Sequence, residues 1–275
     1  MDWRITSLHK LLVAGEVDFA ARKPKSLWSN RLVLPGFDVI DHTKFDSEAK
    51  IEALPETVSL RARHLEGAVL IGARLRNADF TAAQLQGAQL DHSDLRGAKF
   101  ECPAPSSLLE QCTQLRDASL YNAQLQGASL EGALLAVALL DYAQLQGASL
   151  NNAELERTSL ANAQLQGASL NGAQLLGASL IKAQLQGASL DGAWLAGASL
   201  ESAQLQGATL ANVFAWRADA RNAAWEITRV FNPKTEPDPT YSMIIWQKKM
   251  ARRHAAFRRR HAALLYRIDA EPRSI

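Results

Sequence analysis

Large apolar residues recur at every fifth position through most of this chain. Between Gln84 and Leu210, a leucine or phenylalanine fills almost every fifth position, and an alanine precedes it by two. The other three positions are mostly polar or small. A period of five matches neither the helical period of 3.6 nor the two-residue period of a strand. It matches a chain that turns a corner every five residues, with leucine and alanine pointing inward. Four such sides would close a square coil of twenty residues.

A longer repeat supports this coil. The string Ala-Gln-Leu-Gln-Gly begins at Ala83, Ala123, Ala143, Ala163, Ala183 and Ala203. The five later copies are twenty residues apart, and a fixed short period of this kind is typical of a solenoid. The strings would then stack on one side of the coil, where their glutamines can form amide ladders along its axis.

The pattern resembles the pentapeptide-repeat family, whose consensus is alanine, aspartate or asparagine, leucine and two variable positions. The resemblance runs from Leu60 to about Trp225, with Ala215, Ala220 and Trp225 holding the last apolar positions in degenerate form. It implies an all-β fold, a right-handed quadrilateral β-helix, and a bacterial source. The family serves many roles, so the resemblance alone does not fix a function.

The rest of the chain divides around this repeat. Residues 1–56 are predicted to be an N-terminal cap, with a short helix over residues 3–21 and an extended stretch over 27–45 that turns at Pro35-Gly36. Residues 57–227 form the β-helix, about eight coils and about 40 Å long at one strand spacing per coil. Residues 228–240 are a proline-rich linker, and residues 241–275 a basic amphipathic C-terminal α-helix.

One irregular segment, residues 101–114, interrupts the repeat. An in-register bulge that replaces two sides of one coil would keep every later Ala-Gln-Leu-Gln-Gly string above the first. A ten-residue loop would instead move the later strings by two sides. We favour the bulge. Cys102 and Cys112 both lie in this segment, and without a wider cysteine framework or a signal peptide we expect reduced thiols.

Apolar side chains at outward positions are the first candidate contact residues. One side carries Leu134, Trp194 and Phe214, and Trp216 lies at a neighbouring outward position. Exposed apolar patches usually mark contact sites. Either a partner binds here, or the chain's own C-terminal segment folds back over the patch.

The basic helix supplies the second set. Met243, Met250, Phe257 and Leu264 form an apolar stripe at intervals of seven residues. Residues 241–275 hold nine basic and two acidic side chains, a charge of +7 in a chain whose net charge is +2. The helix could lie on an anionic membrane surface, contact nucleic-acid phosphates or an acidic protein, pack on the β-helix, or pair with its copy in a homodimer. The candidate residues are Lys248, Lys249, Arg252, Arg253, Arg258, Arg259 and Arg260.

The sequence shows no catalytic constellation. The six histidines are scattered, and His254 and His261, seven apart, are too widely spaced for the usual metal-binding pair. We therefore expect no enzyme activity, no cofactor, no metal and no small-molecule substrate. With no apolar run of eighteen residues, we expect a cytoplasmic protein, associated with a membrane surface in one alternative and the soluble part of a longer membrane protein in another.

The predicted function is a non-enzymatic scaffold that presents a rigid β-helix to a protein or membrane-surface partner. The alternatives are a DNA mimic that binds topoisomerases, as some members of the resembling family do, and a secreted bacterial effector. Residues 58–227 hold fifteen acidic and eleven basic side chains, a charge of −4. This weak charge disfavours mimicry of a polyanion.

Overall fold

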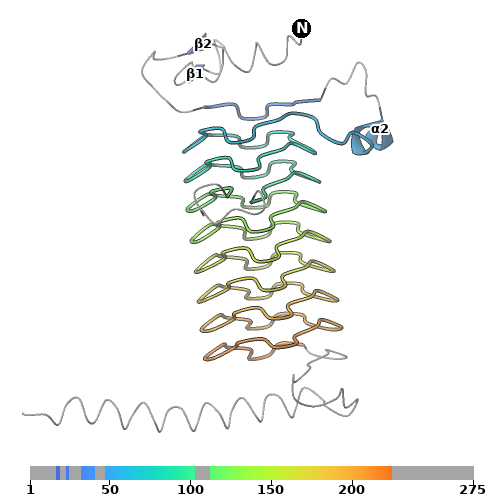
Figure 1. Cartoon of the computed structure of the whole chain (residues 1–275), viewed down its shortest axis with the longest axis vertical. Helices are drawn as coiled ribbons and strands as arrows, with labels where there is room; N and C mark the ends of the chain where they lie inside the picture. Colours follow the sequence, from blue (N-terminus) through green and yellow to red (C-terminus); the bar gives the residue numbers. More distant parts are fainter. Residues whose placement is uncertain (1–16, 19–22, 25–31, 41–46, 103–111, 225–275) are drawn as a thin grey trace, which may run out of the picture.

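The chain folds into a rod of stacked square coils (Figure 1). The structure is a computed structural model, and it describes residues 17–18, 23–24, 32–40, 47–102 and 112–224. In the regular part, each side of a coil forms one parallel β-bridge with the residue twenty positions later, as Gln124 does with Gln144. The backbone N–H of Leu125 donates to the carbonyl of Gln144 at 2.7 Å, and this bond recurs from coil to coil.

The outward bridging residues define four faces, which we name in chain order. Face A carries His64, Gln84, Gln114, Leu134, Glu154, Gln174, Trp194 and Phe214. Face B carries Val33, Val69, Gln89, Ser119, Leu139, Ser159, Ser179, Ser199 and Asp219. Face C carries Asp38, Arg74, Asp94, Gln124, Gln144, Gln164, Gln184, Gln204 and Ala224. Face D carries Ser59, Asp79, Lys99, Ser129, Ser149, Ser169, Ser189 and Thr209.

The inward positions form one continuous core. The leucines and alanines of the repeat are buried along the whole rod, and Phe80 stacks on Phe100 with ring centroids 4.8 Å apart. The two residues after each inward leucine form the corner, and the second of them has a positive φ, as at Gly127 (64°) and Asn122 (53°). Glycine and asparagine tolerate this left-handed backbone best, which explains why they recur there. The predicted inward positions of the leucines and alanines are confirmed.

The β-helix begins earlier in the chain than the sequence indicated. Residues 32–40, which we placed in the N-terminal cap, form sides B and C of a first coil through the Val33–Val69 and Asp38–Arg74 bridges. The predicted turn at Pro35-Gly36 is present, with a φ of 65° at Gly36. The pentapeptide spacing hides this coil because residues 41–56 separate it from Leu60.

In the part of the chain that the structure describes, three short elements lie outside the coils. Strands β1 (Val17–Asp18) and β2 (Lys23–Pro24) pair in antiparallel fashion. Helix α2 (Glu48–Glu52) projects from the side of the rod (Figure 1). The predicted helix over residues 3–21 is therefore wrong at Val17 and Asp18, and the rest of that prediction falls largely outside the described residues.

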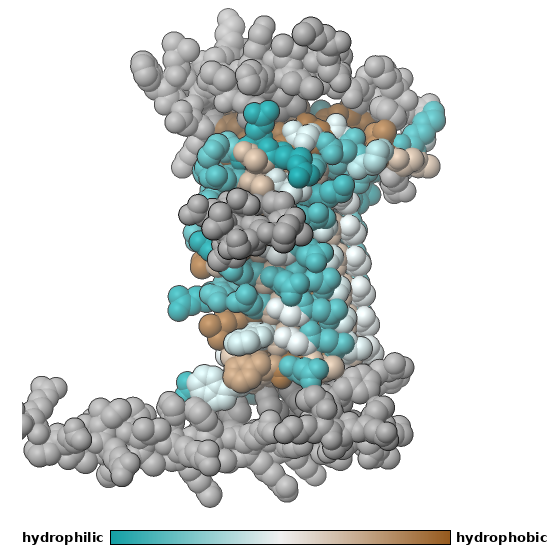
Figure 2. Space-filling view, in the orientation of Figure 1, coloured by the Kyte–Doolittle hydropathy of each residue, from teal (hydrophilic) through white to brown (hydrophobic). Residues whose placement is uncertain are grey.

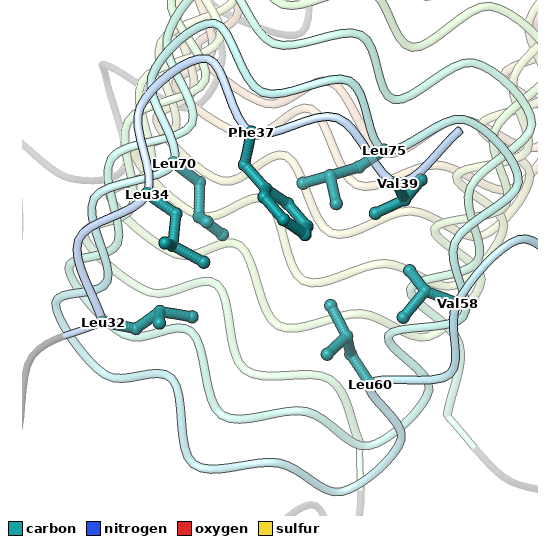
Figure 3. A pocket seen from close by; sticks show the side chains of 8 residues that line it. All are labelled: Leu32, Leu34, Phe37, Val39, Val58, Leu60, Leu70 and Leu75. Carbon is teal, nitrogen blue, oxygen red and sulfur yellow. The ribbon is translucent and has the colours of Figure 1, made fainter. Parts of the chain in front are cut away.

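The N-terminal end of the core opens into an apolar pocket (Figure 3). Side chains of the first two coils point into it from faces B, C and D: Leu32, Leu34, Phe37, Val39, Val58, Leu60, Leu70 and Leu75. An open β-helix end usually needs a cover over such a core.

The interruption of the repeat is a loop rather than the favoured bulge. Gln84 bridges Gln114, thirty residues later, and Lys99 bridges Ser129. One coil therefore contains ten extra residues, and the Ala-Gln-Leu-Gln-Gly string that starts at Ala83 lies on face A while the later copies lie on face C. A period of five sets which residues point inward, but not on which of four equivalent sides a string falls.

Cys102 and Cys112 form a disulfide at the base of this loop, so the prediction of reduced thiols is wrong. Cys102 occupies the corner after face D, and the repeat resumes at Thr113 and Gln114 on face A. The two Cα atoms lie 4.0 Å apart. The predicted linker and basic C-terminal helix lie outside the described residues.

Candidate functional site

An exposed aromatic pair lies on face A near the C-terminal end of the rod. Trp194 and Phe214 occupy bridging positions on adjacent coils and expose 58% and 52% of their surface. Their ring centroids are 5.7 Å apart. The neighbouring positions on this face are Glu154 and Gln174, so the sequence departs from its polar pattern here. Both residues belong to the contact set predicted from sequence.

Two further apolar residues extend this pair along the adjoining corner. Leu176 is 49% exposed, and Trp216 is partly buried, with the Arg217 guanidinium 4.7 Å from its ring centroid. We call Leu176, Trp194, Phe214 and Trp216 the end patch. Figure 2 shows apolar side chains interrupting the polar surface toward the lower end of the rod, where the described chain ends.

Leu134 does not belong to this patch, contrary to the prediction. It occupies face A but is only 1% exposed. Its N–H donates to the carbonyl of Thr113, which directly follows Cys112 at the base of the disulfide loop.

A second group of exposed apolar residues was not predicted from the sequence. Leu139 on face B is 49% exposed, and Tyr121 and Tyr142 at the next corner are 42% and 48% exposed. The two tyrosine rings lie 5.5 Å apart. The sequence does contain a signal for this group, because Leu139 takes the position that Ser119, Ser159, Ser179 and Ser199 hold on other coils.

Faces C and D are polar and internally bonded. The predicted glutamine ladder is confirmed on face C, where Gln126 donates to Gln144 and Gln146 to Gln164, both at 2.6 Å. On face D, the Ser169 hydroxyl donates to Asn151 and the Ser189 hydroxyl to Asn171, again at 2.6 Å. Side chains engaged with the next coil stiffen the rod and leave fewer groups for a partner.

Charged groups gather toward the N-terminal end. Asp94 accepts from Arg76 at 2.6 Å and from Arg96 at 2.7 Å. Asp79 is buried and accepts from the Thr81 N–H and from Arg61. Burial acts to raise the pKa of Asp79, but the hydrogen bonds from Thr81 and Arg61 outweigh it and hold the pKa below its ordinary value. The Arg76–Asp94 and Arg61–Asp79 pairs join one coil to the next, whereas Arg96 and Asp94 pair within one coil.

Within the described ranges, the structure brings no three histidine, cysteine, aspartate or glutamate side chains together as a metal site. Nor does any helix of that part of the chain have the length and apolar character needed to cross a membrane. The basic candidates Lys248, Lys249, Arg252, Arg253, Arg258, Arg259 and Arg260 lie outside the described residues.

Several solved structures resemble this chain. HetL, a pentapeptide repeat protein involved in heterocyst differentiation regulation from the cyanobacterium Nostoc sp. strain PCC 7120, is 26% identical, with 75% of this chain and 91% of HetL covered and a TM-score of 0.28. Full-length QnrB1, a plasmid-mediated fluoroquinolone resistance protein, is 17% identical, with coverage of 64% and 92% and a TM-score of 0.32. A pentapeptide repeat protein from the Arabidopsis thaliana thylakoid lumen is 25% identical, with coverage of 47% and 66% and a TM-score of 0.27.

No protein with a curated description matches the sequence. The family model for pentapeptide repeats matches in 8 copies, over residues 64–101, 111–136, 118–157, 138–175 and 158–195. These matches fall on the coils whose four-sided bridging is described above. The chain therefore belongs to the pentapeptide-repeat proteins, and its fold is their right-handed quadrilateral β-helix.

Proposed function

We propose that this β-helix is a non-enzymatic scaffold that binds a protein partner through the end patch. The observation that carries the proposal is the exposure of Trp194 and Phe214, 58% and 52%, on a face whose other exposed positions are polar. Tryptophan and other aromatic residues are enriched at the centres of protein interfaces, where they supply large contact areas at low entropic cost.

The geometry of the patch favours a protein partner. The two aromatic rings lie on adjacent coils of a rigid face, so their spacing is fixed before binding. Preorganised contacts lose little conformational entropy on association. A membrane-surface partner rests on the basic residues of 241–275, and we retain it as the alternative outcome of the experiment below.

Mimicry of DNA is the weaker alternative. A polyanion mimic needs a continuous negative field. Faces C and D carry long runs of amides and hydroxyls, from Gln124 to Gln204 and from Ser129 to Thr209. An absence of inhibition in a gyrase supercoiling assay would agree with this reading.

Site-specific cross-linking of the full chain tests the proposal. A photoreactive amino acid placed at position 194 should cross-link a discrete protein in extracts of the source organism, whereas the same group at position 204 on face C should not. The double substitution Trp194→Gln/Phe214→Gln should lower capture about tenfold or more. Glutamine is the matched replacement, because face A carries it at Gln84, Gln114 and Gln174. Equal cross-linking from both positions would contradict the proposal, as would binding to anionic liposomes alone.

A further inference from the structure

A band of exposed apolar side chains crosses face B on a single coil. Val137 lies at the corner between faces A and B, Leu139 on face B, and Tyr142 at the corner between faces B and C. They are 48%, 49% and 48% exposed, and Tyr121 of the preceding coil extends the band at the second corner. We call these four residues the central band. It is separate from the end patch, whose aromatic pair lies on face A.

The backbone indicates that this band is not incidental. Val137 has a φ of 64°, a left-handed conformation in which a β-branched residue is strained. The equivalent corner position carries glycine on four other coils and Asp117, Arg157 or Arg217 on three, none of which is β-branched. Strained residues persist mainly where a site requires them.

The band lies at the midpoint of face B. Nine bridging residues follow one another along this face, and Leu139 is the fifth, with Val33, Val69, Gln89 and Ser119 on one side and Ser159, Ser179, Ser199 and Asp219 on the other. Two rods could face each other through face B. A two-fold axis between them, perpendicular to both rods and at the level of Leu139, would align the two copies antiparallel over their full described length. The small serines on both sides of Leu139 would permit the spacing of about 10 Å typical of packed sheets.

The charges beside the band fit this axis. At the corner between faces A and B, Arg116 and Asp117 lie one coil before Val137, and Glu156 and Arg157 one coil after it. The two-fold axis would place Arg116 opposite Glu156 of the second copy, and Asp117 opposite Arg157 of the second copy. All four side chains are exposed. In the part of the chain that the structure describes, Asp117, Glu156 and Arg157 form no ion pair, and Arg116 forms only a 3.6 Å contact with Glu154.

The charges at the corner between faces B and C are also compatible with this axis. Asp91 lies two coils before Asp141, and Lys182 two coils after the adjacent Tyr142, so the same axis would bring them to neighbouring positions. The one like-charged pair would be Asp141 with its own copy, and each Asp141 carboxylate already accepts from Ser159 of its own chain at 2.7 Å. A parallel pairing would instead place Arg116 opposite the corner of Tyr121, without an ion pair.

We propose that face B is the surface on which a second copy of this chain binds, antiparallel, about the central band. The contact consists of an apolar centre formed by both copies of Val137, Leu139 and Tyr142, flanked by complementary charges. This arrangement is isologous, so it closes at two copies and leaves Trp194 and Phe214 of each rod on face A.

The mass of the full chain in solution tests the proposal. Sedimentation equilibrium from about 1 to about 100 µM should show a monomer–dimer equilibrium. Leu139→Ser should raise the dissociation constant about a hundredfold, because each dimer buries two copies of the leucine. Serine occupies this position on four other coils, so the variant should keep its fold and circular dichroism spectrum. Trp194→Gln on face A is the matched control and should dimerise like the wild type.

A charge swap tests the orientation. Asp117→Arg should weaken the dimer because it faces Arg157 of the second copy, and the double variant Asp117→Arg/Arg157→Asp should restore it. Three results would overturn the proposal: a wild type that stays monomeric over this range, a Leu139→Ser variant that dimerises as tightly as the wild type, and a double variant no tighter than Asp117→Arg. The second result would assign any dimer to another surface, such as residues 241–275.

Discussion

At the scale of single residues, the fold demands one backbone conformation at every corner. From Ala62 to Asn222 the second corner residue adopts a positive φ at every described corner except that of Cys102, where the loop begins. Glycine occupies many of these positions, and asparagine occupies Asn77, Asn122, Asn152, Asn162, Asn212 and Asn222. Val137 has the same positive φ, although a β-branched side chain makes this conformation sterically unfavourable. Departures from the rule therefore reveal where the surface has a second requirement.

Replacing this valine should stabilise the fold. Val137→Asn removes a β-branched residue from the left-handed region, and we expect the free energy of unfolding to rise by about 1 kcal/mol. Urea unfolding of the Leu139→Ser background, where the dimer is weakened, isolates the effect on the single chain. Val58→Asn is the comparison, because it makes the same exchange at a side chain that lines the apolar pocket, and it should destabilise the same background. An unchanged or lower unfolding free energy for Val137→Asn would mean that the corner carries no strain.

At the scale of an element, the disulfide loop is an insertion between two complete sides. Glu101 and Cys102 complete one corner, and Thr113, Gln114 and Leu115 begin the next side. Coils before and after it bridge each other directly, as Gln84 and Gln114 do. The loop is therefore dispensable for the stacking of the rod.

Deletion of residues 103–112 should leave a folded rod. Cys102 would join Thr113 in the regular register, and the ladder of bridges would be preserved. Hydrogen exchange at Leu85 and Leu115 should stay slow, and unfolding should stay cooperative. Deletion of only residues 103–107 would serve as the comparison, since it shortens the loop without restoring the corner. Fast exchange on both sides of the junction in the full deletion would show that the loop helps to hold the coils together.

The sequence was sufficient to predict the core residues but not all of the surface residues. The period placed the buried leucines and alanines correctly, because burial repeats at every coil. It could not place the string at Ala83 on the right face, because the core is the same on all four sides. It grouped Leu134 with Trp194 and Phe214 because the three share face A, but the period does not indicate which outward position of a face is buried. It passed over Leu139, whose exposure is apparent only when its column is compared with the serines above and below.

At the scale of the whole molecule, the rod behaves as a stack of nearly equivalent units. Each coil contacts only its neighbours, so its stability should be close to a sum of terms for coils and for the contacts between them. The apolar pocket at the N-terminal end marks where the stack opens. Length and the direction of each face are the two properties that such a stack can vary independently.

Removal of one whole coil should separate these two properties. Deleting residues 161–180 should shorten the rod and lower the urea m-value by roughly a tenth, while Trp194 stays on face A. Deleting residues 161–170 should also give a folded rod, but with Trp194 on face C. Spin labels at positions 124 and 194 would distinguish the two, because the labels lie on opposite faces after the first deletion and on one face after the second. Labels on opposite faces in both variants would refute the stacking rule.

The four-sided coil also has a genetic meaning. The loop adds no side to the coils and leaves every downstream face in place, whereas an insertion of ten residues that form two further sides would rotate every downstream column by half a turn without altering a contact within it. A gene built on this repeat can therefore redirect a whole binding surface to the opposite side of the rod in one event, by a change in length alone and with no substitution in the surface itself.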